Sequence, residues 1–340
     1  MAEVTIKTIA KEAGVSISLV SQVLNDRPVR VSPETRERIK RVASEMHYVP
    51  NMLASCLKSK QTKTIALLAP FTPFGFFSNL IYNVQKYARQ AGYLTIVVNT
   101  FENEEHEAEE LALYQSGMFD GMLIAPLAQS HSEQLFAQMK NEKYPFVFVD
   151  RFNPSCLTPI VSSDHEKIGY DMTMKAVGEG KKDIVFAYRE GGDNSAGDLR
   201  LAGYKRAMID SGLEPHCVLF SYHNDRSDKD SMRKAVSSLE KEPDVLFIHS
   251  GYYLPLLASA CVSYGFDLKK ISFMMVDGFA FTEAAADMAE LLFAISGRCL
   301  IAVQDIDMIA KHAVSLLLSQ IKGESQYGSK VLIPSQYQSF

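Results

Sequence analysis

Residues 5–25 read TIKTIAKEAGVSISLVSQVLN, and this stretch predicts two short helices joined by a tight turn. Thr5 can cap the first helix, because its side-chain oxygen can accept a hydrogen bond from a free backbone N–H group. The apolar residues of this helix recur at the spacing of one helical face: Ile6, Ile9, Ala10 and Ala13. Gly14 can adopt the left-handed conformation that closes a helix, and Ser16 can cap the next one. The stretch therefore predicts a helix-turn-helix.

The outward face of the second helix carries mostly short polar or amide side chains. Its members are Ile17, Ser18, Ser21, Gln22 and Asn25. Such side chains suit a helix that lies in the major groove and contacts base edges. A helical hairpin without a DNA partner is the alternative for these residues alone, because helix-turn-helix patterns are weak by themselves.

A third helix follows and favours the DNA-binding interpretation. Ser32 can cap it and Pro33 fits its first turn. Its apolar residues recur at helical spacing: Ile39, Val42, Ala43 and Met46. Residues 52–57 then predict a two-turn helix that is too short to be stable alone in water. Three helices can therefore share one core, and the fourth needs a partner.

Three segments in this region carry a family resemblance: AKEAGVSISLVSQVLN, VSPETRERI and YVPNMLASCL. In order and spacing they resemble the lactose repressor/galactose repressor (LacI/GalR) family of bacterial transcription factors. The resemblance extends over essentially all 340 residues. It implies a hinge helix that folds when dimer and DNA are both present, with Leu57 wedged into a kinked minor-groove step.

Pattern and resemblance together predict one set of DNA-contacting residues. The set is Thr5, Ser16, Ile17, Ser18, Ser21, Gln22, Asn25, Arg30, Asn51, Ala54 and Leu57. Gln22 stands where the family frequently has arginine, and glutamine prefers adenine where arginine prefers guanine. The operator should differ accordingly.

Charge is divided unevenly along the chain. Residues 1–62 hold ten Lys and Arg against six Asp and Glu, a net charge of +4, whereas the remainder carries −9 and the whole chain −5. A basic end on an acidic protein is expected to face phosphate, and its binding should weaken with salt. The length predicts two or three domains. We expect a helix-turn-helix domain over 1–50, a hinge helix and linker over 51–64, and a core over 65–340.

Composition argues against several other classes of protein. The N-terminus lacks a signal peptide pattern, and no apolar stretch is long enough to span a bilayer, which predicts a cytoplasmic protein. The five cysteines form no CxxC pair and the eight histidines no HExxH motif, so we expect free thiols, no metal and no cofactor. A transport solute-binding protein would need a signal peptide and would lack the basic helical head. An enzyme would need a nucleophile with its base or a metal cluster, and Asp164-His165-Glu166 is the nearest candidate. We interpret that tripeptide as a loop at the start of the second lobe.

In the core, short apolar runs recur at the spacing of βαβ units. The first series covers residues 65–69, 95–98, 122–125 and 146–149, and the second covers 184–187, 218–220, 245–248 and 273–276. Each series predicts a doubly wound parallel sheet, so the core should be α/β with two lobes. The resemblance implies a periplasmic-binding-protein-like core whose chain crosses between lobes three times. We expect lobe one over about 65–161 and 295–322, and lobe two over about 162–294 and 323–340.

Polar residues at the strand ends suggest an effector site. Open α/β sheets bind ligands outside the carboxyl ends of their strands, so the crevice between two such lobes is the expected place. The family's pocket-lining positions match Asp150, Arg200, Asp277 and Gln304, and four aromatic side chains are added as stacking candidates: Phe74, Phe76, Tyr222 and Tyr252. Carboxylate, guanidinium and amide groups suit a polyhydroxylated ligand, and no GxxxxGK loop is present, so we predict a sugar.

The identity of the effector and its effect on DNA binding stay open. Ser250-Gly251-Tyr252-Tyr253 replaces an Asn-Asp pair that contacts effector in most members, so a nucleoside, a phosphorylated metabolite or a protein co-effector is the alternative to a sugar. The sequence does not fix whether the effector releases or strengthens DNA binding. We expect a homodimer on a pseudo-palindromic DNA site, because no leucine heptad follows residue 339.

Overall fold

The computed structural model describes ten stretches of the chain: residues 4–24, 28–48, 61–70, 75–101, 103–127, 132–190, 195–222, 227–277, 298–324 and 328–339. The chain divides into two compact units, residues 1–60 and 61–340. None of the helices in the described stretches is long and apolar enough to cross a bilayer.

The first unit contains the predicted three helices: α1 (Ile6–Ala13), α2 (Ile17–Leu24) and α3 (Pro33–Glu45). Gly14 ends α1 in the left-handed conformation, with φ +63°, so the tight turn arises where the sequence places it. Ile9, Val20 and Ile39, one residue from each helix, are fully buried in a common core. The helix-turn-helix prediction is confirmed.

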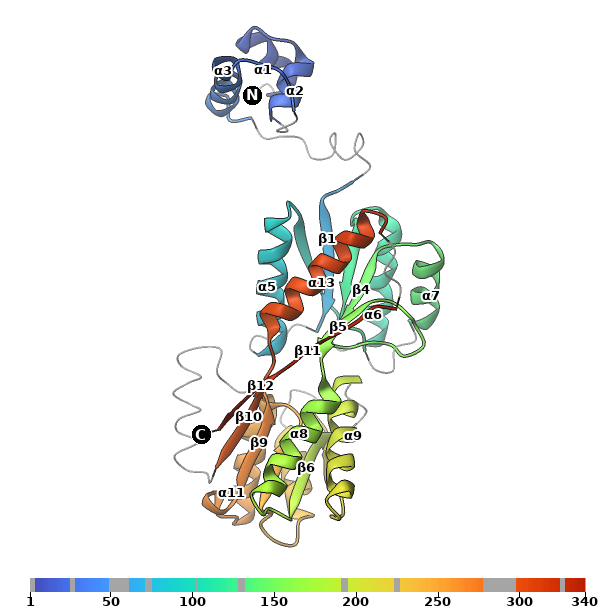
Figure 1. The fold of residues 1–340 in the computed structure, drawn as a ribbon, viewed down its shortest axis with the longest axis vertical. Helices are drawn as coiled ribbons and strands as arrows, with labels where there is room; N and C mark the ends of the chain where they lie inside the picture. The colour runs from blue at the N-terminus through green and yellow to red at the C-terminus, as the bar shows by residue number, and fades with distance from the viewer. Residues whose placement is uncertain are drawn as a thin grey trace. The chain divides into compact units, whose positions relative to one another are not determined.

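The first sheet of the second unit has six strands in the order β11-β5-β4-β3-β1-β2, and all its pairs are parallel. Its strands are β1 (Thr64–Ala69), β2 (Leu94–Asn99), β3 (Gly121–Ile124), β4 (Phe146–Val149), β5 (Ile160–Ser163) and β11 (Lys330–Ile333). One face is covered by α5 (Phe76–Gln90) and α13 (Ile306–Ile321), which lie side by side (Figure 1). The other face is covered by α6 (Glu104–Ala112) and α7 (Glu133–Asn141).

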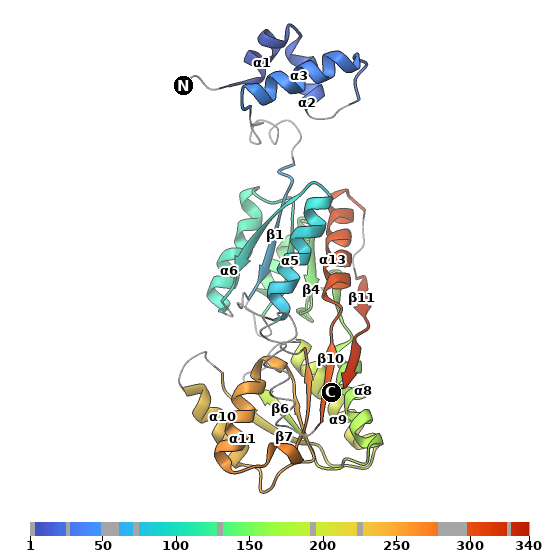
Figure 2. The same cartoon turned by 90° about the vertical axis from the view of Figure 1, so that its left-hand side faces the viewer.

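The second sheet repeats this plan in the order β12-β10-β9-β8-β6-β7, with only β12 antiparallel. Its strands are β6 (Ile184–Arg189), β7 (His216–Phe220), β8 (Val245–Ile248), β9 (Ser272–Val276), β10 (Cys299–Val303) and β12 (Gln336–Ser339). Helices α8 (His165–Gly178) and α9 (Ser195–Asp210) pack on one face, and α10 (Ser227–Ser237) and α11 (Leu254–Tyr264) on the other (Figure 2). The doubly wound, two-lobed α/β core is thus confirmed.

The chain passes between the sheets after β5, after β10 and after β11. This pairing corrects the expected lobe boundaries in two places. Residues 299–303 form β10, which pairs with β9 in the second sheet, although we expected 295–322 in lobe one. Residues 330–333 form β11, which pairs with β5 in the first sheet, although we expected 323–340 in lobe two. A short apolar strand fits either sheet, and only its register with a neighbour decides which one it joins.

Candidate functional site

Two carboxylates occupy equivalent places in the two lobes. Asp150 follows β4 and Asp277 follows β9, and each strand is third in the order of its sheet. The backbone N–H of Asp150 donates to the carbonyl of Val161 (2.9 Å), and that of Asp277 donates to Ala302 (2.8 Å). Both aspartates have left-handed backbone, with φ +63° and +50°. Strain of this kind in a non-glycine residue concentrates at functional sites, and both residues lie where α/β sheets bind ligands.

Asp150 belongs to a buried polar chain that reaches the second lobe. Its Oδ1 lies 3.2 Å from Nε2 of His165, the first residue of α8. Nη2 of Arg200 on α9 lies 3.2 Å from the other ring nitrogen, and Nη1 donates to the carbonyl of His249 after β8 (2.8 Å). Asp150, His165 and Arg200 are all less than 8% exposed. The structure therefore brings two of the predicted effector residues together through a histidine outside the predicted set.

Asp277 is hydrogen-bonded to Gln304, another predicted effector residue. Gln304 donates to it twice, from its backbone N (3.1 Å) and from Nε2 (2.5 Å). The other amide atom, Oε1, is buried and has no hydrogen-bond partner in the described part of the chain. Gln304 is 5% exposed and directly follows β10. The amide thus presents an unused acceptor beside a carboxylate.

Electrostatics differ between the two carboxylates. Burial alone would raise the pKa of Asp150, but the hydrogen bond from His165 and the charge of Arg200 outweigh it, and this pKa lies below its usual range. Burial and the charge of Arg200 lower the pKa of His165, and Asp150 only partly offsets them. Burial raises the pKa of Asp277, and the opposing charge of Arg200 does not cancel this effect. Arg200 therefore acts on both carboxylates, but only Asp150 is strongly held in its charged form.

Two glycines hold His165 and Arg200 together. Helices α8 and α9 approach so closely that a Cβ on Gly169 would lie 2.1 Å from the carbonyl oxygen of Arg200. A Cβ on Gly203 would lie 2.0 Å from the carbonyl oxygen of Glu166. Only glycine allows this backbone-to-backbone packing, which places the first turn of α8 beside Arg200.

Three of the predicted aromatic residues, Phe76, Tyr222 and Tyr252, lie after the carboxyl ends of other strands of the two sheets. The hydroxyls of Tyr222, after β7, and Tyr252, after β8, are 2.7 Å apart, and the two rings make an edge-on contact. Tyr252 is 43% exposed, so its ring is available to a ligand. Phe76 is half-buried at the start of α5 and packs edge-on against Phe77.

In the helical unit, two predicted DNA-contacting residues cap helices. The Thr5 hydroxyl accepts from the backbone N–H of Thr8, and the Thr8 hydroxyl reciprocates, forming a capping box on α1. Ser16 Oγ accepts from the backbone N–H of Leu19 (3.2 Å) at the start of α2. Each cap satisfies a backbone N–H group in the first turn of its helix, which would otherwise lack a partner within the helix.

Around α2, the predicted contact surface is partly exposed. Ile17 is 49% exposed, Ser18 and Arg30 are exposed, and Ser21 and Gln22 are half-buried. Five predicted site residues lie outside the described residues: Asn25, Asn51, Ala54, Leu57 and Phe74.

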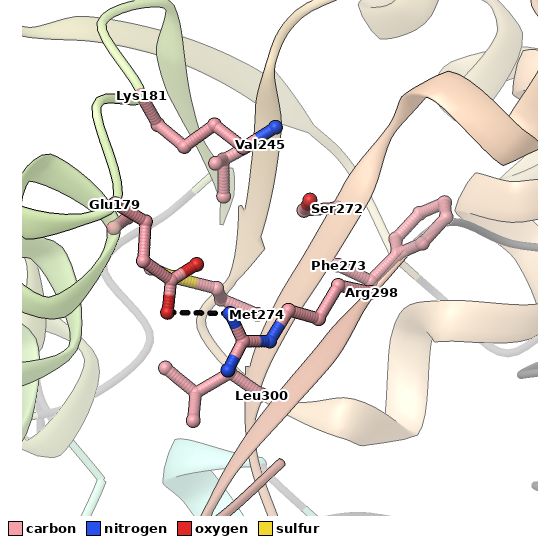
Figure 3. Close-up of a pocket in the computed structure, with 9 residues that line it drawn as sticks. Glu179, Lys181, Val245, Ser272, Phe273, Met274, Arg298 and Leu300 are labelled. Carbon is pink, nitrogen blue, oxygen red and sulfur yellow. Dashed lines mark ion pairs between the residues drawn. The ribbon is translucent and has the colours of Figure 1, made fainter. Parts of the chain in front are cut away.

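A small pocket lies elsewhere, at the amino ends of β8, β9 and β10 (Figure 3). Glu179 and Arg298 form an ion pair of 2.8 Å at its edge. Because the pocket is at the ends of the strands away from Asp277, it is not part of the candidate effector site.

Comparison with known proteins now identifies the family. Residues 62–251 match the sequence model described as periplasmic binding proteins and sugar binding domain of the LacI family. Residues 5–51 match the model for bacterial regulatory proteins of the lacI family. The chain belongs to the LacI family. The resemblance to the LacI/GalR family is confirmed.

Individual LacI-family proteins show how far the similarity extends. The HTH-type transcriptional regulator RegA of Clostridium saccharobutylicum is 30% identical over 210 residues, which is 62% of each chain. The chain therefore spans less than two thirds of RegA in that match. The transcriptional repressor PurR of Vibrio campbellii (strain ATCC BAA-1116) is 27% identical over 320 residues, 94% of this chain and 92% of PurR. A lac repressor dimer, solved bound to operator and the anti-inducer ONPF, has the same fold, with a TM-score of 0.81, 20% identity and coverage of 99% and 98%.

Proposed function

We propose that this LacI-family regulator binds a pseudo-palindromic DNA operator as a homodimer, most simply as a repressor. A small polyhydroxylated effector, a sugar, would control that binding from the carboxyl ends of β4 and β9. The observation that carries the effector proposal is the pair of equivalent aspartates, Asp150 and Asp277, each strained and each hydrogen-bonded. The lac repressor of the same fold is a dimer on its operator, which supports the assembly.

The DNA-binding part of the proposal rests on the helical unit. Ser16 caps α2, and Ile17, Ser18 and Gln22 share the helix that would enter the major groove. We propose the residues predicted from the sequence, including those outside the described stretches, as the DNA contacts. Two copies would read two half-sites about one helical turn apart.

The chemistry of the site favours a neutral ligand with many donors over an anion. Asp150, Asp277 and the free Oε1 of Gln304 all offer acceptors. Two nitrogens of the Arg200 guanidinium are already bonded to His165 and to the His249 carbonyl. A phosphate would bring negative charge next to two carboxylates, whereas sugar hydroxyls can donate to them. The match of residues 62–251 to a sugar-binding domain points the same way.

Thermal unfolding of the full chain across sugars, sugar phosphates and nucleosides tests the effector class. A ligand at a hundred times its dissociation constant stabilises by about 2.7 kcal/mol. We expect a hit among neutral sugars, and we expect Asp150→Asn to abolish it. A hit only among nucleosides or phosphorylated metabolites would refute the sugar proposal, and no hit would favour a protein co-effector.

Operator selection from random duplexes tests the regulator proposal. We expect an inverted repeat whose binding weakens steeply with salt. Recovery of no specific sequence would refute it. We further propose that the protein acts in the cytoplasm without catalysing a reaction, because its relatives are named as transcriptional regulators. Chemical turnover of a bound ligand would contradict this.

A further inference from the structure

A histidine outside the predicted site forms the centre of it. His165 is 1% exposed, and its ring lies between the carboxylate of Asp150 and the guanidinium of Arg200, with 3.2 Å to each. We propose that His165 is a positioning residue of the effector site: a neutral imidazole that holds Asp150, at the end of a lobe-one strand, against Arg200 on a lobe-two helix. This inference rests on the proposed function of Asp150 and Arg200 as effector contacts.

The geometry fixes the tautomer of the ring. A guanidinium has donors and no acceptor, so Nδ1 of His165 must accept the hydrogen bond from Arg200 Nη2. The single proton of the neutral ring is then on Nε2, from which it is donated to Asp150 Oδ1. Each hydrogen bond from Arg200 through His165 to Asp150 therefore has one donor and one acceptor. No described residue makes a hydrogen bond to Oδ2 of Asp150. One carboxylate oxygen is thus held and the other is left for a ligand hydroxyl.

Protonation of the ring would break this arrangement. A proton on Nδ1 would face the N–H of Arg200, so two donors and two positive charges would meet in a buried site. The charged groups around the ring come from several elements: Asp150 and Arg151 from the end of β4, Arg200 from α9, Asp277 from the end of β9, and Asp164 and Glu166 from α8 itself. Glu166 is paired with Arg206 on the surface. Asp150 favours the charged ring, but burial and the charge of Arg200 outweigh it and lower the pKa of His165.

Comparison of the two lobes shows why a histidine is needed here. Asp164 caps α8 and Asp305 caps α13, and the two have nearly the same backbone angles (φ −77°, ψ 78° and φ −82°, ψ 78°). Gln304, just before the second cap, reaches Asp277. The corresponding residue before the first cap is Ser163, whose hydroxyl is buried and bonded to no described residue. The Ser163 hydroxyl does not bond the carboxylate of Asp150, and the side chain that does is His165, one residue after the cap.

Two substitutions separate positioning from packing. His165→Gln supplies an amide whose oxygen can accept from Arg200 and whose nitrogen can donate to Asp150 without a titratable proton. His165→Leu fills similar space but makes neither bond. His106→Gln is the matched control, because it removes a largely exposed imidazole from α6. Each full-length variant is titrated with the sugar that stabilises the wild type, and histidine ring nitrogens are recorded by NMR from pH 8 to pH 5.

We expect the His165 signal, assigned by its loss in the glutamine variant, to show a proton on Nε2 alone at pH 7.5. Sugar affinity should stay within about threefold in His165→Gln and fall about tenfold or more in His165→Leu, as expected for loss of hydrogen bonds to charged groups. A proton on Nδ1 at pH 7.5, or equal affinity in both variants, would overturn the inference. If no sugar binds the wild type, the proposed effector class is wrong. The ring tautomer then still tests whether His165 donates to Asp150 and accepts from Arg200.

Discussion

The close approach of α8 and α9 leads to a sharp prediction for Gly203→Ala. The new Cβ would lie 2.0 Å from the carbonyl oxygen of Glu166 and 2.8 Å from the backbone nitrogen of Tyr170, whereas ordinary contacts begin at 3.4 Å. The helices would have to separate by roughly 1.4 Å, and the obstacle is backbone rather than a flexible side chain. Overpacking costs about 1–3 kcal/mol, and the rigid obstacle argues for the upper end.

Helix propensity partly offsets this cost, since alanine favours a helix over glycine by about 1 kcal/mol. We therefore expect Gly203→Ala to lower the free energy of unfolding by about 2 kcal/mol. Gly178→Ala is the matched control: Gly178 is the last residue of α8, and a Cβ there meets nothing within 4 Å. It should be neutral or stabilise by up to about 1 kcal/mol.

Thermal unfolding of the full-length variants measures the difference. For large domains 1 kcal/mol corresponds to about 2–4 °C, so the two variants should differ in Tm by roughly 4–12 °C. Because Arg200 lies three residues before Gly203 on α9, Gly203→Ala should also weaken the response to effector. If Gly203→Ala unfolds at or above the wild-type Tm, the close helix packing inferred from the backbone distances is wrong.

Three further predictions concern the helical unit and the start of the core. Ser16→Ala removes the cap of α2 and should destabilise the helical unit by about 1 kcal/mol, seen as earlier loss of helical circular dichroism. Gln22→Arg should shift the selected operator from adenine towards guanine at one position per half-site, and an unchanged operator would remove Gln22 from the base contacts. Asp120 accepts hydrogen bonds from the backbone N–H groups of Thr62 (2.6 Å) and Lys63 (2.9 Å), at the start of the core. Asp120→Ala should therefore reduce the effect of the effector on operator affinity more than it reduces the affinity for the effector. Equal loss of both would contradict that role.

Local features were predictable from the sequence because they depend on neighbours along the chain. The turn at Gly14 and the cap at Thr5 are each decided by one residue type with a specific backbone role. The apolar runs of the inner strands were predictable because a parallel strand buried on both faces is apolar throughout, whereas the edge strands β2 and β7 are partly exposed. The family resemblance then supplied Asp150, Arg200, Asp277 and Gln304, and the structure places these four close to one another.

The parts that the sequence did not predict depend on contacts distant in the chain. Asp164-His165-Glu166 was interpreted as a loop, but Asp164 accepts from the backbone N–H of Lys167 as the cap of α8, and His165 begins that helix. An Asp directly before a helical pattern was the available signal. The partner of His165 is Arg200, 35 residues away, and nothing local indicates that contact.

Two of the three crossings, those after β5 and after β10, explain how one site can be coupled to the rest of the core. Asp150 ends a first-sheet strand, and its partner His165 begins a helix on the second sheet. Asp277 ends a second-sheet strand, and its partner Gln304 directly precedes the helix that covers the first sheet. Each carboxylate is therefore held by a residue on the segment where the chain enters the other lobe. A ligand that bonds to both carboxylates must compete with or reinforce those contacts. Any rearrangement of the lobes has to change the conformation of the connecting segments. Ligand binding would therefore shift the equilibrium between arrangements of the lobes through these segments.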